Sequence, residues 1–184
     1  MKKGYTLVEL LISISIVIII IALVVNFLVT GSLGYQFINR KVQYQRNARL
    51  VAERMIREVK KASLIDSASD GSNLIFSYTY YDFSTNPISS TSSTVKYYVD
   101  SNGILRRQVK QGNLWVGNNP LTESDFRVLT PIFYYYNSSR NLVSPQNAEL
   151  IEVVLKFDGD RNNIPDYTLT FNIFLPVRSV YYVK

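Results

Sequence analysis

The chain has 184 residues, a formal net charge of +6, and neither cysteine nor histidine. It therefore has no thiol nucleophile, no disulfide and no Ser-His-Asp arrangement, and zinc would lack its usual ligands. The carboxylates that remain are scattered among predicted turns and strand ends. We therefore expect the protein not to be an enzyme.

An apolar segment near the N-terminus predicts a membrane span. From Leu10 to Val29 the chain is apolar except for two serines and one asparagine. Twenty helical residues rise about 30 Å, which matches the hydrocarbon core of a bilayer. Two lysines, at positions 2 and 3, precede the segment, so the positive-inside rule places the N-terminus in the cytoplasm. We expect a single-pass protein of the cytoplasmic membrane, with the span at about 8–29 and the later residues outside.

The residues before this segment form a motif, KKGYTLVELL. Two lysines, a glycine, an aromatic residue, Thr-Leu-Val-Glu and then an apolar helix resemble the class III signal of type IV pilins and pseudopilins. The resemblance implies that residues 1–4 are a leader peptide, which a prepilin peptidase cuts after Gly4. Tyr5 would become the N-methylated first residue of the mature chain, at a position where the family more often has phenylalanine.

Glu9 is a carboxylate at the edge of the apolar segment. It has two interpretations. One is an interfacial acid in the first helical turn, favoured by the helix dipole. The other comes from the resemblance, which implies an assembly residue that faces the N-terminal amine of a neighbouring subunit. A carboxylate that is costly in lipid gains a charged partner when helices associate, so we expect Glu9 to favour assembly.

The helical pattern continues beyond the membrane segment. Apolar residues recur mostly at spacings of three or four, at Ile38, Val42, Ala48, Ala52, Met55, Val59 and Ala62. No proline interrupts residues 5–62, and Asn26 stands where many major pilins have a helix-kinking proline. The pattern predicts one helix over 5–62 whose outer part, the stem, packs on the head. The missing proline favours a minor pilin or pseudopilin.

The positive charge lies in this stem. Residues 40–61 contain eight Lys or Arg and two Glu, whereas residues 62–184 contain ten basic and eleven acidic residues. Two i,i+4 ion pairs are expected on the helix, Glu53–Arg57 and Arg54–Glu58. The basic residues have three interpretations: a solvated face, a contact with anionic lipid headgroups, or a contact with DNA. DNA has the least support, because the aromatic residues lie mostly elsewhere.

Residues 63–184 predict a β-rich head. We expect strands over 74–81, 114–116, 126–136, 150–157 and 167–175, a hairpin over 95–109 with an Asn102-Gly103 turn, and a loop over 83–94. The fold class is then α+β, with a long N-terminal helix packed on an antiparallel sheet of six or seven strands. The order of these elements is similar to that of J-type pseudopilins and W-type minor pilins.

The segment DGDRNNIPD, residues 158–166, joins the last two predicted strands. Oxygen ligands at alternate positions can wrap a calcium ion, and here they would come from Asp158, Asp160, Asn162, the backbone carbonyl of Ile164, and Asp166. The spacing resembles the repeats of thrombospondin type 3 and dockerin-like modules, although Asn163 replaces the turn glycine and no bidentate Glu follows. The alternatives are a calcium site and a polar hairpin turn.

These features predict a structural, membrane-inserted subunit: a minor pilin or pseudopilin that initiates or caps a type IV pilus or a type II secretion pseudopilus. The resemblance implies that its partners are other pilin or pseudopilin subunits, the prepilin peptidase and an inner-membrane assembly platform with its ATPase. Two alternatives remain. One is a DNA-uptake pilin, and the other is a membrane-anchored binding domain that never assembles.

Overall fold

The computed structural model describes residues 6–82, 89–125, 127–130 and 132–176. Within them it has one long helix, nine strands and one short 3-10 helix, η1 (Pro145–Asn147). The strands are antiparallel and form sheets of five and four strands, so the predicted α+β class is confirmed. The chain divides into two compact units, residues 1–43 and residues 44–184, and each is described by itself.

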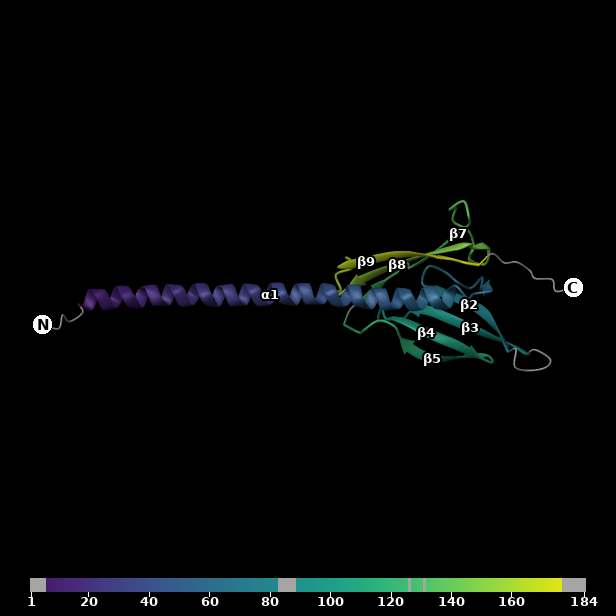
Figure 1. The fold of residues 1–184 in the computed structure, drawn as a ribbon, viewed down its shortest axis with the longest axis horizontal. Helices are drawn as coiled ribbons and strands as arrows, with labels where there is room; N and C mark the ends of the chain where they lie inside the picture. The colour runs from purple at the N-terminus through teal and green to yellow at the C-terminus, as the bar shows by residue number, and fades with distance from the viewer. Residues whose placement is uncertain (1–5, 83–88, 126, 131, 177–184) are drawn as a thin grey trace. The chain divides into compact units, whose positions relative to one another are not determined.

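The helix α1 runs from Leu7 to Val59 without interruption, close to the predicted 5–62 (Figure 1). The chain has no proline before Pro87, so every residue inside the helix can donate its N–H to the residue four positions back. In the first unit, the most apolar 18-residue window has a mean hydropathy of 3.1 and none of it is buried. By length and composition this helix can cross a membrane.

The first sheet contains the strands β1 (Leu64–Ile65), β2 (Asn73–Asp82), β3 (Ser89–Val99), β4 (Leu105–Gln111) and β5 (Leu114–Pro120), paired in chain order. The prediction of a loop over 83–94 is wrong for residues 89–94, which belong to β3. Hydroxyl pairs favour the strand there: Ser77 and Thr94 are hydrogen-bonded at 2.9 Å, and Thr79 and Ser92 at 3.3 Å. Residues 83–88 lie outside the described part of the chain.

The turn between β3 and β4 confirms the predicted hairpin. Val99 pairs with Leu105, and Asp100 organises the residues between them. Its Oδ1 accepts hydrogen bonds from the backbone N–H groups of Asn102 and Ile104, each at 2.9 Å. Gly103 has φ +78°, a left-handed conformation that glycine adopts without a steric penalty.

The second sheet is built around β8 (Leu150–Asp158). β9 (Tyr167–Phe174) pairs with β8 along its whole length, which confirms the predicted hairpin. On the other edge, β6 (Arg127–Leu129) and β7 (Phe133–Tyr136) pair with successive parts of β8. The single strand predicted over 126–136 is therefore two strands.

The strand pairing changes between β6 and β7. Just before β7, the N–H of Ile132 donates at 2.7 Å to the carbonyl of Gly71, which precedes β2. The register against β8 shifts by one residue across the gap, from Leu129↔Lys156 to Phe133↔Val153. The hydrogen bond from Ile132 to Gly71 links the second sheet to the segment that leads into the first sheet.

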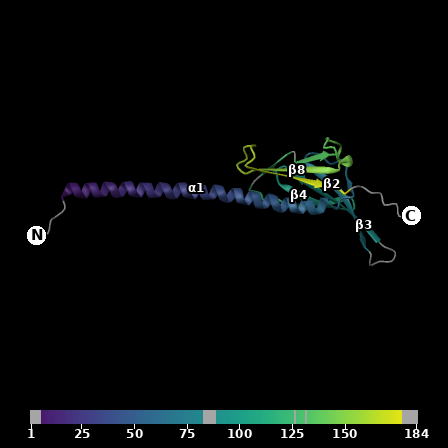
Figure 2. The same cartoon turned by 45° about the horizontal axis from the view of Figure 1, so that its top comes forward.

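The prediction of one sheet with six or seven strands is wrong, because the chain leaves the first sheet after Pro120 and builds a second. Two sheets allow both inner faces to pack on the same helical segment, residues 44–59. One core cluster contains residues of this segment and of both sheets. Figure 1 shows strands of both sheets beside this part of α1, and Figure 2 shows the arrangement from a second direction.

The buried stripe of the stem differs in part from the prediction. Ala48, Ala52, Met55, Val59 and Ala62 are buried as expected, whereas Ile38 and Val42 are 63% and 53% exposed. Two unpredicted residues, Tyr44 and Val51, are buried. The ring of Tyr44 stacks on Phe157 with centroids 6.4 Å apart and an interplanar angle of 8°. The aromatic contact explains why the stripe includes position 44, which apolar spacing alone did not indicate.

Candidate functional site

Glu9 lies in the first turn of α1, where it closes a reciprocal pair with Thr6. Its Oε2 accepts hydrogen bonds from the backbone N–H of Thr6 at 2.9 Å and from the Thr6 hydroxyl at 3.1 Å. In return, the Thr6 Oγ1 accepts a hydrogen bond from the Glu9 N–H at 3.3 Å. This is a capping box, in which two otherwise unpaired N–H groups at a helix start are satisfied.

The capping box is visible in the sequence as Thr-x-x-Glu. It gives Glu9 a partner within its own chain. The acid position in the first turn agrees with the helix-dipole interpretation, and the box does not exclude a second role in assembly. Gly4 and Tyr5, the predicted cleavage and methylation residues, lie outside the described part of the chain.

The loop between β8 and β9 brings together three of the predicted metal ligands. Carboxylate oxygens of Asp158, Asp160 and Asp166 lie within 4.8 Å of one another. Asp158 is fully buried, whereas Asp160 and Asp166 are exposed. Each carboxylate oxygen has two lone pairs, so the cluster has the chemistry of a site for a hard cation.

The same carboxylates already organise the loop. Asp158 accepts hydrogen bonds from the N–H groups of Asn162 at 3.1 Å and Asn163 at 3.0 Å. Asp166 accepts one from Gly159 N–H at 2.7 Å, and the Asn162 amide donates to Asp160 at 2.8 Å. These bonds have the pattern of a polar turn, the alternative interpretation.

The two remaining predicted ligands have different environments. The Asn162 Oδ1 accepts a hydrogen bond from the N–H of Ile164 at 2.7 Å, and the Ile164 side chain is 65% exposed. Asn163, which replaces the turn glycine, has φ +67°. Asparagine tolerates this conformation better than most residues, so the loop keeps its turn without glycine.

Arg127 is a charged partner of the loop that the sequence analysis missed. Its Nη2 lies 3.2 Å from Asp158 Oδ2, and it also donates to Asn163 Oδ1. Desolvation alone would raise the pKa of Asp158, but the Asn163 N–H and the Arg127 guanidinium outweigh it and hold this pKa below its usual value. Asp158 is therefore ionised at pH 7, and the positive charge of Arg127 offsets part of its negative charge.

A second missed group joins the stem to the first sheet. Glu58 Oε2 accepts hydrogen bonds from the Tyr97 hydroxyl and from Arg107 Nε, both at 2.8 Å. Glu58 Oε1 lies 3.4 Å from Arg54 Nε, so the predicted Arg54–Glu58 pair is confirmed. The predicted Glu53–Arg57 pair is wrong, because no such ion pair is present among the described residues.

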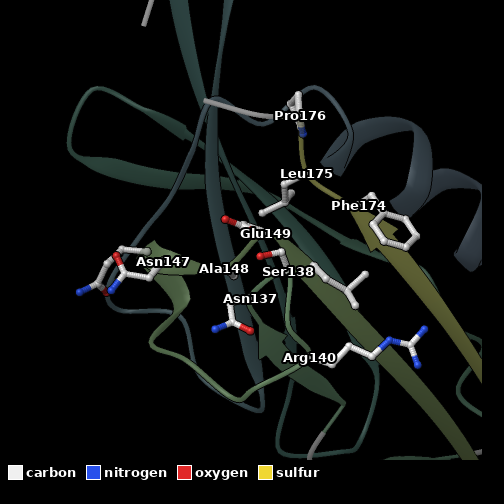
Figure 3. Close-up of a pocket in the computed structure, with 11 residues that line it drawn as sticks. Asn137, Ser138, Arg140, Asn147, Ala148, Glu149, Phe174, Leu175 and Pro176 are labelled. Carbon is white, nitrogen blue, oxygen red and sulfur yellow. The ribbon is translucent and has the colours of Figure 1, made fainter. Parts of the chain in front are cut away.

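A cavity of about 560 Å³ lies where β8 begins and β9 ends. Its lining includes Asn137, Arg140, Asn147, Glu149 and Phe174, which Figure 3 shows around the opening. Most of these side chains are exposed. Both polar and apolar side chains line this cavity.

Comparison with known proteins gives one result, at the N-terminus. Residues 1–25 match the family described as the prokaryotic N-terminal methylation motif. No curated protein and no solved structure matches the chain. The match covers residues 1–6, Glu9 and most of the apolar segment, and it includes the first turns of α1, which begins at Leu7. The chain therefore carries a class III prepilin signal together with a long N-terminal apolar helix, which is the N-terminal organisation of a type IV pilin-like precursor.

Proposed function

We propose that the chain is a structural subunit, a minor pilin or pseudopilin, that initiates or caps a type IV pilus or a type II secretion pseudopilus. The observation that supports this most strongly is the methylation motif over residues 1–25, which includes the start of a long helix whose most apolar window has no buried residue. Such an apolar surface needs lipid or other helices around it. In a subunit that moves from a membrane into a fibre, lipid surrounds the helix first and the helices of other subunits surround it afterwards.

The proposed pathway has three steps. A prepilin peptidase on the cytoplasmic face cuts after Gly4, and the new N-terminus at Tyr5 is methylated. The span anchors the chain in the cytoplasmic membrane with the head outside. The assembly platform then extracts the subunit, whose helix packs against those of other pilin or pseudopilin subunits.

Glu9 has a defined part in this pathway. In the single chain its carboxylate is bonded to Thr6, but these partners carry no charge. The positively charged amine of a neighbouring Tyr5 would bond the carboxylate more strongly, because hydrogen bonds between ions are about twice as strong as neutral ones. Glu9 therefore favours the assembled state over the free subunit.

The test is Glu9→Ala, followed by membrane fractionation, N-terminal mass analysis and measurement of the protein in sheared fibres. We expect normal insertion and cleavage but no incorporation into fibres. Ser15→Ala is the matched control, because it removes an exposed polar side chain that bonds only a backbone carbonyl of the same helix. Normal incorporation of Glu9→Ala would contradict the proposed role.

We also propose that the loop 158–166 binds calcium. Support comes from the three carboxylates within 4.8 Å of one another, whose charges together exceed the two positive charges of Arg127 and of Arg161 in the loop. The test is calorimetric titration of the full chain in detergent micelles with calcium chloride. Asp160→Asn should weaken binding at least tenfold, and Asp125→Asn, an exposed acid outside the loop, should leave binding unchanged. No heat above buffer at millimolar calcium would end the idea.

A further inference from the structure

The outward side of the stem carries a regular row of charges. Arg46, Arg49, Glu53, Arg57 and Lys60 are all exposed and follow one another at spacings of three and four. This spacing places them on one side of a helix. The buried stripe, which includes Ala48, Met55 and Val59, has the same spacing on the opposite side. We call these five charged residues, together with Leu50, the stem face.

The charges of the stem face are not used inside the subunit. None of its five charged residues has an ion pair or a hydrogen bond from its side chain among the described residues. The contrast with Arg54 and Glu58 is clear, because these two stem residues are paired with each other. Contacts within the subunit therefore explain the charges of Arg54 and Glu58, but they do not explain the five charges of the stem face.

The pattern of the face indicates what kind of surface it complements. Four basic residues surround one acid, Glu53, at the centre of the row. A polyanion such as DNA or an anionic lipid surface would be repelled at that point. Leu50, on the flank of the row, is 58% exposed, and a protein partner would gain by covering its apolar side chain. The face therefore matches a protein surface with the opposite pattern.

A second copy of the same chain does not have that pattern. Side by side, two stem faces would bring basic residues against basic residues. A shift along the helix axis could pair Glu53 with one arginine of the other copy but would leave most of the remaining charges opposed. Like charges across a contact disfavour the wrong partner, so the face selects against self-association.

We propose that the stem face binds the helical stem of a different subunit, one that presents acidic residues at helical spacing around a central basic residue. The inference rests on the proposed function, since it names the partner that such a subunit would have in a fibre. From Arg46 to Lys60 the contact would extend about 21 Å, or four helical turns. It makes the subunit a heterotypic neighbour and disfavours a polymer of this chain alone.

The first experiment uses a charge-inverted version of the full chain as the acidic partner. The variant carries Arg46→Glu, Arg49→Glu, Arg57→Glu and Lys60→Glu together with Glu53→Lys. Each version is labelled with one dye, either donor or acceptor, at Asn113→Cys, an exposed turn position in a chain without cysteine. Energy transfer is then measured in zwitterionic vesicles for three pairs: wild type with wild type, inverted with inverted, and wild type with inverted.

We expect the mixed pair to associate at least fivefold more strongly than either like pair, with the difference lost at 0.5 M salt because exposed charges are screened. Equal association of all three pairs would overturn the inference. A DNA gel shift is run in parallel. Binding of duplex DNA by the wild-type chain but not by the inverted chain would also overturn it, in favour of a polyanion.

The second experiment separates this inference from the proposed function. Arg49→Glu/Arg57→Glu is compared with Lys110→Glu/Arg140→Glu, which changes the net charge equally at exposed head positions. In the cells from which the chain comes, the stem variant should be cleaved normally but incorporated into fibres at least fivefold less than the control. Equal incorporation of both variants overturns the inference alone. A wild-type chain that is not cleaved overturns the proposed function.

Discussion

Glu9 and Thr6 are hydrogen-bonded to each other at the start of α1. The carboxylate accepts hydrogen bonds from the backbone N–H of Thr6 at 2.9 Å and from its hydroxyl at 3.1 Å. The same carboxylate therefore has two possible uses, as a helix cap within one chain and as a charged partner between chains. A substitution that keeps the hydrogen bonds but removes the charge can separate them.

Glu9→Gln is that substitution, since glutamine also completes a capping box. We expect the variant to be inserted and cleaved as the wild type is, because its helix start is preserved. We expect its incorporation into fibres to fall to the level of Glu9→Ala, because the amide cannot form an ion pair with the N-terminal amine. The measurement is the ratio of fibre to membrane protein on immunoblots. If Glu9→Gln assembles normally, Glu9 acts only as a cap.

Glu58 should be important for the stability of the head. It lies between the stem and the first sheet and accepts hydrogen bonds from Tyr97 and Arg107. Glu58→Gln removes the charge that these donors and Arg54 share, and we expect a loss of about 1–3 kcal/mol in the free energy of unfolding. Urea unfolding of the full chain in micelles, followed by circular dichroism, measures this loss.

The matched control for Glu58 is Glu53→Gln, on the same helix. Glu53 is exposed and has no ion pair among the described residues, so its substitution should change stability by less than about 0.5 kcal/mol. Equal losses for the two variants would show that the contact between Glu58 and the sheet does not stabilise the head.

The head should lose stability in acid. Burial alone would raise the pKa of Glu58, but hydrogen bonds from Arg107 and Tyr97 and nearby positive charge lower it below its usual value. The pKa of Asp158 is lowered as well. Because these groups have a lower pKa folded than unfolded, their contribution is complete above the unfolded-state pKa of about 4 and is lost as pH falls through the folded-state pKa.

We therefore expect the urea midpoint of the wild type to be steady between about pH 7 and pH 5 and to fall below about pH 4. Glu58→Gln should start from a lower midpoint and lose less of it in acid, because one of the titrating groups is gone. Parallel curves for the two proteins below pH 4 would argue against the role of Glu58.

Gly103 is required at its turn for two reasons. Its φ is +78°, and a Cβ at this position would overlap the Cγ of Arg127. Gly103→Ala should therefore destabilise the head by about 2–3 kcal/mol and disturb the contact between Arg127 and Asp158. Gly112→Ala is the control, because Gly112 has φ +58° but open space around it, so only the backbone penalty of about 1 kcal/mol remains. Equal losses of stability for the two variants would show that the Arg127 side chain moves away and relieves the overlap.

The sequence predicted most elements of the fold because their signals are local. The uninterrupted helix, the Asn102-Gly103 turn and the β8–β9 hairpin follow from periodicity and turn chemistry. The start of β3 could not be predicted, because the Ser-Thr run of residues 89–94 has a loop-like composition. Its strand structure depends on pairing with β2, which is a tertiary contact.

The division into two sheets has a similar explanation. Nothing local marks β5 and β6 as members of different sheets, and the alternation of side chains over 126–136 predicts one strand where the structure has β6 and β7. Tyr44 joined the core through its stack on Phe157, a contact between residues distant in the sequence. Of the candidate site, the acids of the 158–166 loop could be predicted from spacing, but Arg127 could not, since it comes from another strand.

The most direct test of the account is the mass of the N-terminal peptide after the chain is expressed together with a prepilin peptidase. The account predicts a mature chain that begins at Tyr5 and carries one added methyl group on its amine. An intact leader, with Met1 to Gly4 still present, would contradict it, because Glu9 would then have no neighbouring N-terminal amine to face.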